Sequence, residues 1–144
     1  GEVVANLAAS SRFSRTLAPL DHALCVFFGD LNYRVMAPNQ TVRDAIAAGE
    51  IAQVHREDQL AQELAAGNIL PGFAEPPVRF PPTYKYDTGT SVYDTSEKQR
   101  TPSWTDRVLY RGEGASCLSY ESAQGPTISD HKPVACALEL KVPA

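Results

Sequence analysis

Two short polar motifs each adjoin an apolar run that predicts a strand, and this arrangement constrains the fold more than any other feature. Residues 29–34 follow the unbroken apolar run 24–28, and residues 129–133 precede the run 134–140. An unbroken apolar run is typical of a central strand that is buried on both faces. Apolar residues alternate along 134–140, which predicts a strand with one buried face. The chain therefore predicts a sheet whose strand ends carry polar side chains.

The stretch between these motifs predicts two helices. In residues 41–49, Thr41 is a candidate N-cap and Gly49 is a candidate end. Residues 57–66 carry leucines at helical spacing and are followed by Gly67. We therefore expect one helix over each range.

Other segments complete the expected architecture. Residues 68–83 are rich in proline and glycine, which is typical of an irregular loop. Residues 108–110 predict a further strand, and residues 1–4 have the pattern of the middle of one. Strand, helices, loop and strands in this order predict a layered α/β domain.

Composition narrows the class of protein. A chain of 144 residues is one domain or a piece of one. Its net charge of −4 argues against nonspecific binding to nucleic acid through bulk charge. The three cysteines lack metal-ligand spacing, and their odd number favours reduced thiols and a cytoplasmic location. No signal peptide and no bilayer-length apolar run are present, so we expect any membrane contact to be peripheral.

The first polar motif offers Asp30 and Asn32 for acid–base chemistry. If the backbone stays extended past Asp30, both side chains point to the same side. The carboxylate could then take a proton from a water that the amide helps to hold. The alternative is a simple strand-end turn, in which Asp and Asn bond locally.

The second motif places Asp130 and His131 before a predicted strand. A protonated His131 can donate to a phosphate oxygen, and Asp130 can hold a metal or fix a water. Asp106 could accept from His131 and orient its ring. The alternatives are a solvated turn at residues 130–131 and an ordinary surface ion pair between Asp106 and Arg107.

With these motifs, the chain resembles the C-terminal half of an inositol polyphosphate 5-phosphatase catalytic domain. That family belongs to the endonuclease/exonuclease/phosphatase superfamily and is similar in fold to deoxyribonuclease I. The resemblance spans residues 24–140 and is carried by four blocks, at 28–34, 82–100, 101–109 and 129–131. It implies that residues 1–144 form a partial domain with the C-terminal half of a DNase I-like four-layer α/β sandwich.

The resemblance implies roles for five residues around the scissile phosphate. Asp30 would act as general base on the attacking water, and Asn32 would position the water and the phosphate. His131 would bind the 5-phosphate, Asp106 would orient His131, and Asp130 would lie near the water or the metal.

A second group of residues matches the family's grip on the neighbouring 4-phosphate. These residues are Tyr84, Lys85, Lys98 and Arg100. Lysine and arginine charges and a tyrosine hydroxyl all suit phosphate. The alternative for the three cations is a solvated basic loop.

The resemblance also implies Mg²⁺ as cofactor. The family's main ligand for this ion is a glutamate that matches no residue of this chain. Residues 4–9 could be the remnant of another family block, in which Asn6 would occupy a histidine position and Val4 an asparagine position. The residues that hold the metal therefore stay unassigned.

The resemblance implies magnesium-dependent hydrolysis of the 5-phosphate from phosphoinositides or soluble inositol polyphosphates. Such an enzyme would work peripherally on the cytosolic face of membranes. One alternative is a catalytically incomplete module that only binds phosphoinositides. Another is a nuclease of the same fold, against which the basic groups at Lys85 and Lys98 argue, so we expect no nucleic-acid partner.

Overall fold

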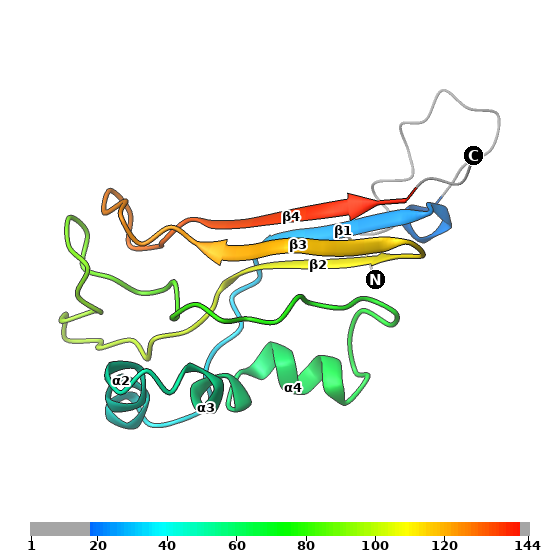
Figure 1. The fold of residues 1–144 in the computed structure, drawn as a ribbon. Helices are drawn as coiled ribbons and strands as arrows, with labels where there is room; N and C mark the ends of the chain where they lie inside the picture. Colours follow the sequence, from blue (N-terminus) through cyan, green and yellow to red (C-terminus); the bar gives the residue numbers. More distant parts are fainter. Residues whose placement is uncertain (1–17, 142–144) are drawn as a thin grey trace.

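The computed structural model describes residues 18–141, with strands on one side of the molecule and helices on the other (Figure 1). A short 3-10 helix, η2 (Pro19–Asp21), precedes the first strand, β1 (Leu24–Asp30). The other elements in chain order are α2 (Asn39–Ala47), α3 (Ile51–Arg56), α4 (Gln59–Ala65), β2 (Asp106–Gly112), β3 (Ala115–Ser122) and β4 (Val134–Leu140). The irregular segment between α4 and β2 runs between the helices and the strands.

The four strands form two antiparallel pairs. β1 pairs with β2, and the register places Asp30 opposite Asp106 at one end. β3 pairs with β4, with an irregularity between Cys117 and Ser119. The sequence predicted β1, β2 and β4 but missed β3.

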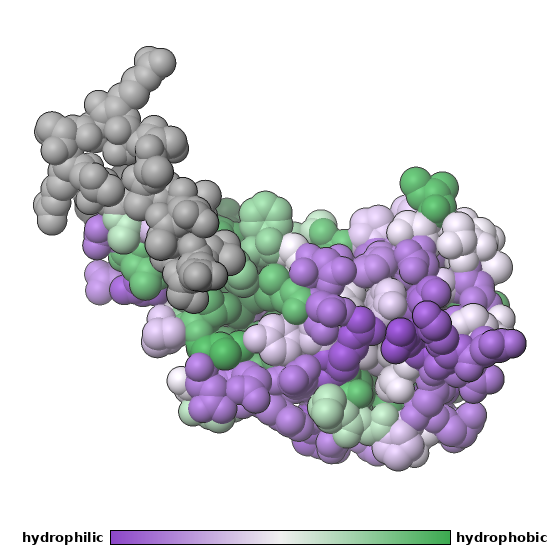
Figure 2. Space-filling view, turned by 180° about the vertical axis from the view of Figure 1, so that it is seen from behind, coloured by the Kyte–Doolittle hydropathy of each residue, from purple (hydrophilic) through white to green (hydrophobic). Residues whose placement is uncertain are grey.

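The prediction that β1 is buried on both faces is wrong. The side chains of Val26, Phe27 and Phe28 are exposed, and Phe28 reaches 71%. Burial on both faces requires another layer of the protein packed against each face of the strand. The exposed side chains at 26–28 lack such cover in the described residues, where β1 also has a strand partner on one edge only, which is β2. Figure 2 shows hydrophobic side chains gathered in one area of an otherwise largely polar face.

The helices differ from the prediction in number and in their starts. The first helix begins at Asn39 after Pro38, so Thr41 lies inside it and does not cap it. Gly49 follows its end with a φ of 77°, as expected for a residue that ends a helix. The predicted second helix corresponds to α4, which Asp58 caps by accepting from the Ala61 N–H. The short helix α3 lies before the predicted range and was missed.

The core lies between the helices and the strands. Trp104, Leu60 and Leu109 are completely buried. The indole nitrogen of Trp104 donates to the carbonyl of Phe80 at 3.0 Å, so the irregular segment is fixed to the chain just before β2. The proline-rich stretch 68–83 forms no helix or strand, as the sequence predicted.

A buried ion network fixes the start of β2. The guanidinium of Arg107 binds both carboxylate oxygens of Asp58 at 2.9 Å and both of Glu75 at 2.6–2.7 Å. Tyr120 also donates to Glu75, at 2.9 Å. Burial alone would lower the pKa of Arg107, but the hydrogen bonds and charges of Glu75 and Asp58 outweigh it and raise that pKa. The network joins α4, the irregular segment and β2.

Three further findings bear on the expectations from sequence. Cys25, Cys117 and Cys136 are free and half-buried, and burial raises the pKa of Cys136 to about 11. No helix in the described part of the chain has the length and apolar character to cross a membrane. The expected strand at 1–4 and the block at 4–9, with Val4 and Asn6, lie outside the described residues.

Candidate active site

The pairing of β1 with β2 brings the first two candidate residues together. Asp30 ends β1 and Asp106 begins β2, and the two are partners in the antiparallel register. The N–H of Leu31 donates to the carbonyl of Thr105 at 2.7 Å, which continues the contact beyond the strands. Asp30 is exposed and Asp106 is half-buried, so both carboxylates lie at an accessible strand end.

Asn32 does not continue the extended backbone. The prediction that strand periodicity points the Asp30 and Asn32 side chains to the same side is therefore wrong. Its φ is 59°, in the left-handed region that asparagine tolerates better than most residues. Its backbone N–H donates to the Asp30 carboxylate at 2.9 Å, which closes a turn of the kind that Asp favours. The turn, rather than strand periodicity, keeps Asp30 and Asn32 together.

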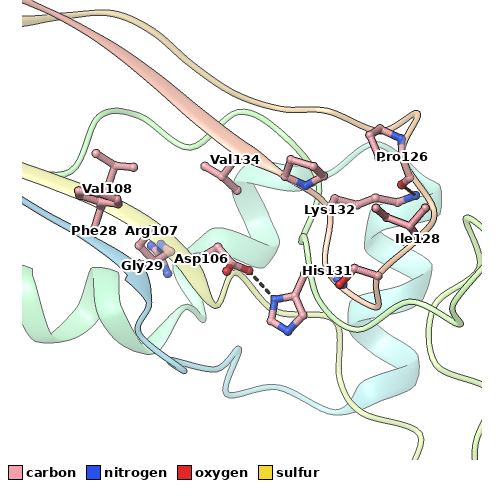
Figure 3. Close-up of a pocket in the computed structure, with 12 residues that line it drawn as sticks. Phe28, Gly29, Asp106, Arg107, Val108, Pro126, Ile128, His131, Lys132 and Val134 are labelled. Carbon is pink, nitrogen blue, oxygen red and sulfur yellow. Dashed lines mark hydrogen bonds and ion pairs between the residues drawn. The ribbon is translucent and has the colours of Figure 1, made fainter.

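His131 and Asp106 form the contact that the sequence predicted. Oδ2 of Asp106 lies 2.6 Å from Nδ1 of His131 (Figure 3). The Thr105 hydroxyl donates to the same carboxylate oxygen at 3.0 Å. Because Nδ1 faces Asp106, Nε2 of His131 is the ring nitrogen left for a ligand. The alternative ion pair between Asp106 and Arg107 does not form, since Arg107 turns into the buried network instead.

Asp130 is fixed through its backbone. Its carbonyl accepts from the N–H of Tyr86 at 2.9 Å, and the following Lys132 N–H donates to Thr83 at the same distance. The Ser129 hydroxyl accepts from the His131 N–H at 3.1 Å. Asp130 itself is half-buried beside His131. The loop before β4 is therefore tied to residues 83–86.

Tyr84 connects the residues predicted to bind the 4-phosphate with those predicted to act on the 5-phosphate. Its backbone pairs with Ser103 on one side and with His131 on the other. The rings of Tyr84 and His131 lie 4.7 Å apart, centroid to centroid. Tyr84 thus joins the residues predicted to bind the 4-phosphate to the predicted catalytic residue His131.

Two of the three cations predicted to bind the 4-phosphate, Lys85 and Arg100, interact with the buried carboxylate of Asp94. Asp94 is 1% exposed and accepts the N–H of Arg100 at 2.8 Å and that of Ser96 at 3.1 Å. These hydrogen bonds, and more weakly the Lys85 charge, lower the pKa of Asp94 to about 2. Lys85 is half-buried and both Lys98 and Arg100 are exposed. Asp94 therefore shapes the turn that carries the last two cations.

A cavity of about 380 Å³ opens beside His131 and Asp106. Figure 3 shows that its labelled residues come from β1, from the start of β2, from the loop leading into β4 and from the first residue of β4. The apolar lining includes Phe28, Val108 and Val134. The polar pair of His131 and Asp106 thus borders a largely apolar space.

The described residues do not form a divalent cation site by themselves. Residues 18–141 contain no group of three or more His, Cys, Asp or Glu side chains placed to hold a metal ion. Asp30, Asp106 and Asp130 therefore do not constitute a ligand set by themselves.

Sequence reasoning missed three residues that support the site. They are Thr105, which binds Asp106, Asp94, which shapes the cationic turn, and Arg34, which contacts Asn32. All three stand inside the blocks that carry the resemblance, so their position was a usable signal. The role of Asp94 was harder to predict, because its burial depends on the fold.

Comparisons with known proteins agree with this geometry. The profile described as Endonuclease/Exonuclease/phosphatase family 2 matches residues 2–137. The phosphatidylinositol 4,5-bisphosphate 5-phosphatase INP51 of Saccharomyces cerevisiae is 45% identical over 136 residues, which cover 94% of this chain and 14% of that protein. The inositol-1,4,5-trisphosphate 5-phosphatase 1 of Schizosaccharomyces pombe is 42% identical over 94% of this chain and 12% of its own length. The chain thus spans about one seventh or less of these relatives.

Solved structures extend the comparison to the fold. The inositol polyphosphate 5-phosphatase domain of SPsynaptojanin, in complex with inositol (1,4)-bisphosphate and calcium, matches with a TM-score of 0.84 and 43% identity. The match covers 92% of this chain and 39% of that one. A Cimex nitrophorin in a ferrous NO complex matches with a TM-score of 0.73 and 34% identity over 81% of this chain and 41% of that one. The chain belongs to the Endonuclease/Exonuclease/phosphatase family 2, and its sequence and its partial DNase I-like fold are those of the inositol polyphosphate 5-phosphatases.

Proposed function

We propose that this chain contributes the catalytic residues of a phosphoric monoester hydrolase that removes the 5-phosphate from inositol compounds. Its substrates would be phosphoinositides such as phosphatidylinositol 4,5-bisphosphate, or soluble inositol polyphosphates. One observation carries the proposal: Asp30 lies opposite Asp106, and Asp106 holds His131 at 2.6 Å. The names of the relatives support the substrate class.

Each residue has a step in the proposed reaction. Asp30 takes a proton from water, and the water oxygen attacks the phosphorus while the bond to the inositol oxygen breaks. The leaving inositol oxygen takes up a proton from solvent. Asn32 donates to the water or to a phosphoryl oxygen. His131 donates from Nε2 to the phosphoryl group, and Asp106 keeps the ring in place. Asp130 lies on the same loop and is placed near the attacking water. The products are inorganic phosphate and the 5-hydroxyl compound.

The adjacent 4-phosphate would be bound by Tyr84, Lys85, Lys98 and Arg100. Tyr84 lies against His131, so a phosphate beside the tyrosine would neighbour the one at the histidine. The exposed cations at 98 and 100 stand on the turn that Asp94 shapes. Charged donors such as lysine and arginine form stronger hydrogen bonds to phosphate than neutral donors do.

The proposed cofactor is Mg²⁺. When bound, a divalent ion offsets charge on the phosphoryl oxygens. The described residues lack a full ligand set, so a complete site would need ligands from elsewhere in the domain. The matched synaptojanin domain was solved with calcium. We further propose that the protein acts peripherally at the cytosolic face of membranes, where phosphoinositide headgroups would be reached.

The test is phosphate release by the full-length protein that carries this chain. Substrates would be phosphatidylinositol 4,5-bisphosphate in vesicles and soluble inositol 1,4,5-trisphosphate, each with Mg²⁺ and with EDTA. We expect release that needs the metal and that falls at least ~10²-fold in Asp30→Ala. Asp44→Ala, at an exposed position on α2, is the matched control. No release by the intact protein, or full activity of Asp30→Ala, would overturn the proposal.

A second candidate is a phosphoinositide-binding module without turnover. The observation that motivates it is that the family's metal-binding glutamate matches no residue of this chain. This candidate predicts that vesicle binding survives Asp30→Ala and is lost when Lys85 and Lys98 are replaced, with no phosphate released. Cleavage of plain or abasic duplex DNA would instead favour a nuclease of this fold.

A further inference from the structure

Arg34 is a cation inside the site that contacts both Asn32 and Tyr84. Its Nε donates to the Asn32 carbonyl at 3.3 Å, and its Nη2 donates to the Asn32 side-chain oxygen Oδ1. Its Cζ also lies 4.7 Å from the centroid of the Tyr84 ring. Arg34 is half-buried, and the described residues offer it no ion pair. Its hydrogen bonds therefore go to Asn32.

The contact decides which way the Asn32 amide faces. A guanidinium has only donors, so it must be met by the amide oxygen and not by the amide NH₂. Asn32 is also held at its backbone, where its N–H donates to Asp30 at 2.9 Å. With both the oxygen and the backbone engaged, the two hydrogens on Nδ2 are left to donate elsewhere. A donor is what an attacking water or a phosphoryl oxygen requires.

The same guanidinium links two separate blocks of the sequence. One face of the guanidinium lies over the Tyr84 ring. The centroid of that ring lies 4.7 Å from the centroid of the His131 ring. A planar cation over an aromatic ring gains both dispersion and electrostatic attraction. The packing restricts the rotamers of Arg34 and so makes its hold on Asn32 more rigid.

We propose that Arg34 is a positioning residue that orients the Asn32 amide with its NH₂ toward the phosphate. The inference rests on the proposed function, because the amide direction matters only if Asn32 donates to substrate or water. Arg34 acts through Asn32 and takes no part in proton transfer. It differs from a merely structural arginine in one consequence: its value to catalysis depends on the presence of Asn32.

A double-mutant cycle in the full-length protein tests this dependence. The variants are Arg34→Met, Asn32→Ala and the two together, assayed by phosphate release from soluble inositol 1,4,5-trisphosphate. We expect Arg34→Met to lower kcat by ~10²-fold, as a small misplacement of a reacting group does, with KM changed by less than about threefold. In the Asn32→Ala background, the same change should cost less than about threefold. Equal costs in both backgrounds would overturn the proposal.

Two further variants separate positioning from general effects. Arg34→Lys keeps the charge but loses the planar fork, so we expect it to recover only part of kcat. Arg56→Met, at an exposed position of α3, is the matched control and should leave kcat unchanged. Full recovery in Arg34→Lys would show that the charge alone matters and would overturn the orienting role.

A readout without turnover keeps this inference distinct from the proposed function. The NMR order parameter of the Asn32 side-chain amide is measured in wild type and in Arg34→Met, with circular dichroism as the check on folding. We expect an ordered amide in wild type and a mobile one in the variant, while the fold is retained. An amide equally ordered in both would overturn the inference even if the wild type releases phosphate. An inactive wild type with the expected amide change would count against the proposed function alone.

Discussion

Oδ2 of Asp106 lies 2.6 Å from Nδ1 of His131, which joins the first residue of β2 to the loop before β4. The pair spans 25 positions of sequence and sets the direction of the imidazole ring. Thr105 donates to the same carboxylate oxygen and so limits how Asp106 can turn. In the proposed reaction, this arrangement leaves Nε2 of His131 aimed at the phosphoryl group.

Asp106→Asn should lower kcat for 5-phosphate release by about 10²-fold in the full-length protein. The amide has a similar shape but no charge, so it no longer stabilises a protonated His131. KM should change much less, because the residues proposed to bind the 4-phosphate are unchanged. Steady-state kinetics with soluble substrate measures both constants. Asp44→Asn on α2 is the control, and equal kcat in the two variants would contradict the role of Asp106.

Arg107→Met should destabilise the chain by about 3–5 kcal/mol, because it leaves Asp58 and Glu75 buried without their cation. The side chains of Arg107 and Asp58 are both 0% exposed and that of Glu75 is 6% exposed. Urea unfolding followed by circular dichroism measures the free energy. Arg111→Met lies on the same strand at an exposed position and should cost less than about 0.5 kcal/mol. Similar losses in both variants would show that the network contributes little.

The sequence predicted local elements where a strong repeating pattern exists. β4 has the bounds expected for it, because apolar residues alternate from Val134 to Leu140. β3 was missed because small and polar residues dominate it and Leu118 faces solvent. The helix α4 lies within the range predicted for it, whereas α3 was missed because its six residues are too few to show a clear helical repeat.

The candidate site was predictable in its members but only partly in its geometry. The contact of Asp106 with His131 could be proposed from complementary chemistry. The pairing of Asp30 with Asp106 could not, because it depends on the register of two strands that are about 75 residues apart. The turn at Asn32 was missed for a different reason: the continuation of an extended strand was assumed where asparagine tolerates a positive φ.

Lys132→Met should loosen the loop that precedes β4. Its buried ammonium donates to the Pro126 carbonyl at 2.8 Å and to Ser91 at 3.4 Å, and lies 4.8 Å from the centre of the Tyr86 ring. Removal of the charge leaves the Pro126 carbonyl without its donor, a loss of about 1–3 kcal/mol locally. The contact between residues 89–91 and residues 126–127 should weaken as a result.

Hydrogen exchange at the Gly89 amide measures this loosening. That amide donates to the Thr127 carbonyl at 2.6 Å, across the two loops that Lys132 joins. We expect exchange about tenfold faster or more in Lys132→Met, since 1.4 kcal/mol corresponds to a factor of ten. Lys141→Met, at an exposed position after β4, is the control. Unchanged exchange at Gly89 would show that the loops hold together without the ammonium.

Asp94→Asn should reveal a contribution to stability that disappears in acid. Hydrogen bonds from Arg100 and Ser96 lower the pKa of Asp94 from 3.8 to about 2. The unfolded state therefore binds the proton first, so the stabilisation is complete above about pH 4 and is lost as the pH falls toward 2. Urea unfolding should show wild type more stable than Asp94→Asn by about 1–3 kcal/mol at pH 7, with a smaller difference at pH 2. Glu121→Gln, at an exposed position on β3, is the control and should leave the free energy of unfolding unchanged at both pH values. If Asp94→Asn differed from wild type by the same amount at pH 7 and at pH 2, the carboxylate charge would not hold the turn.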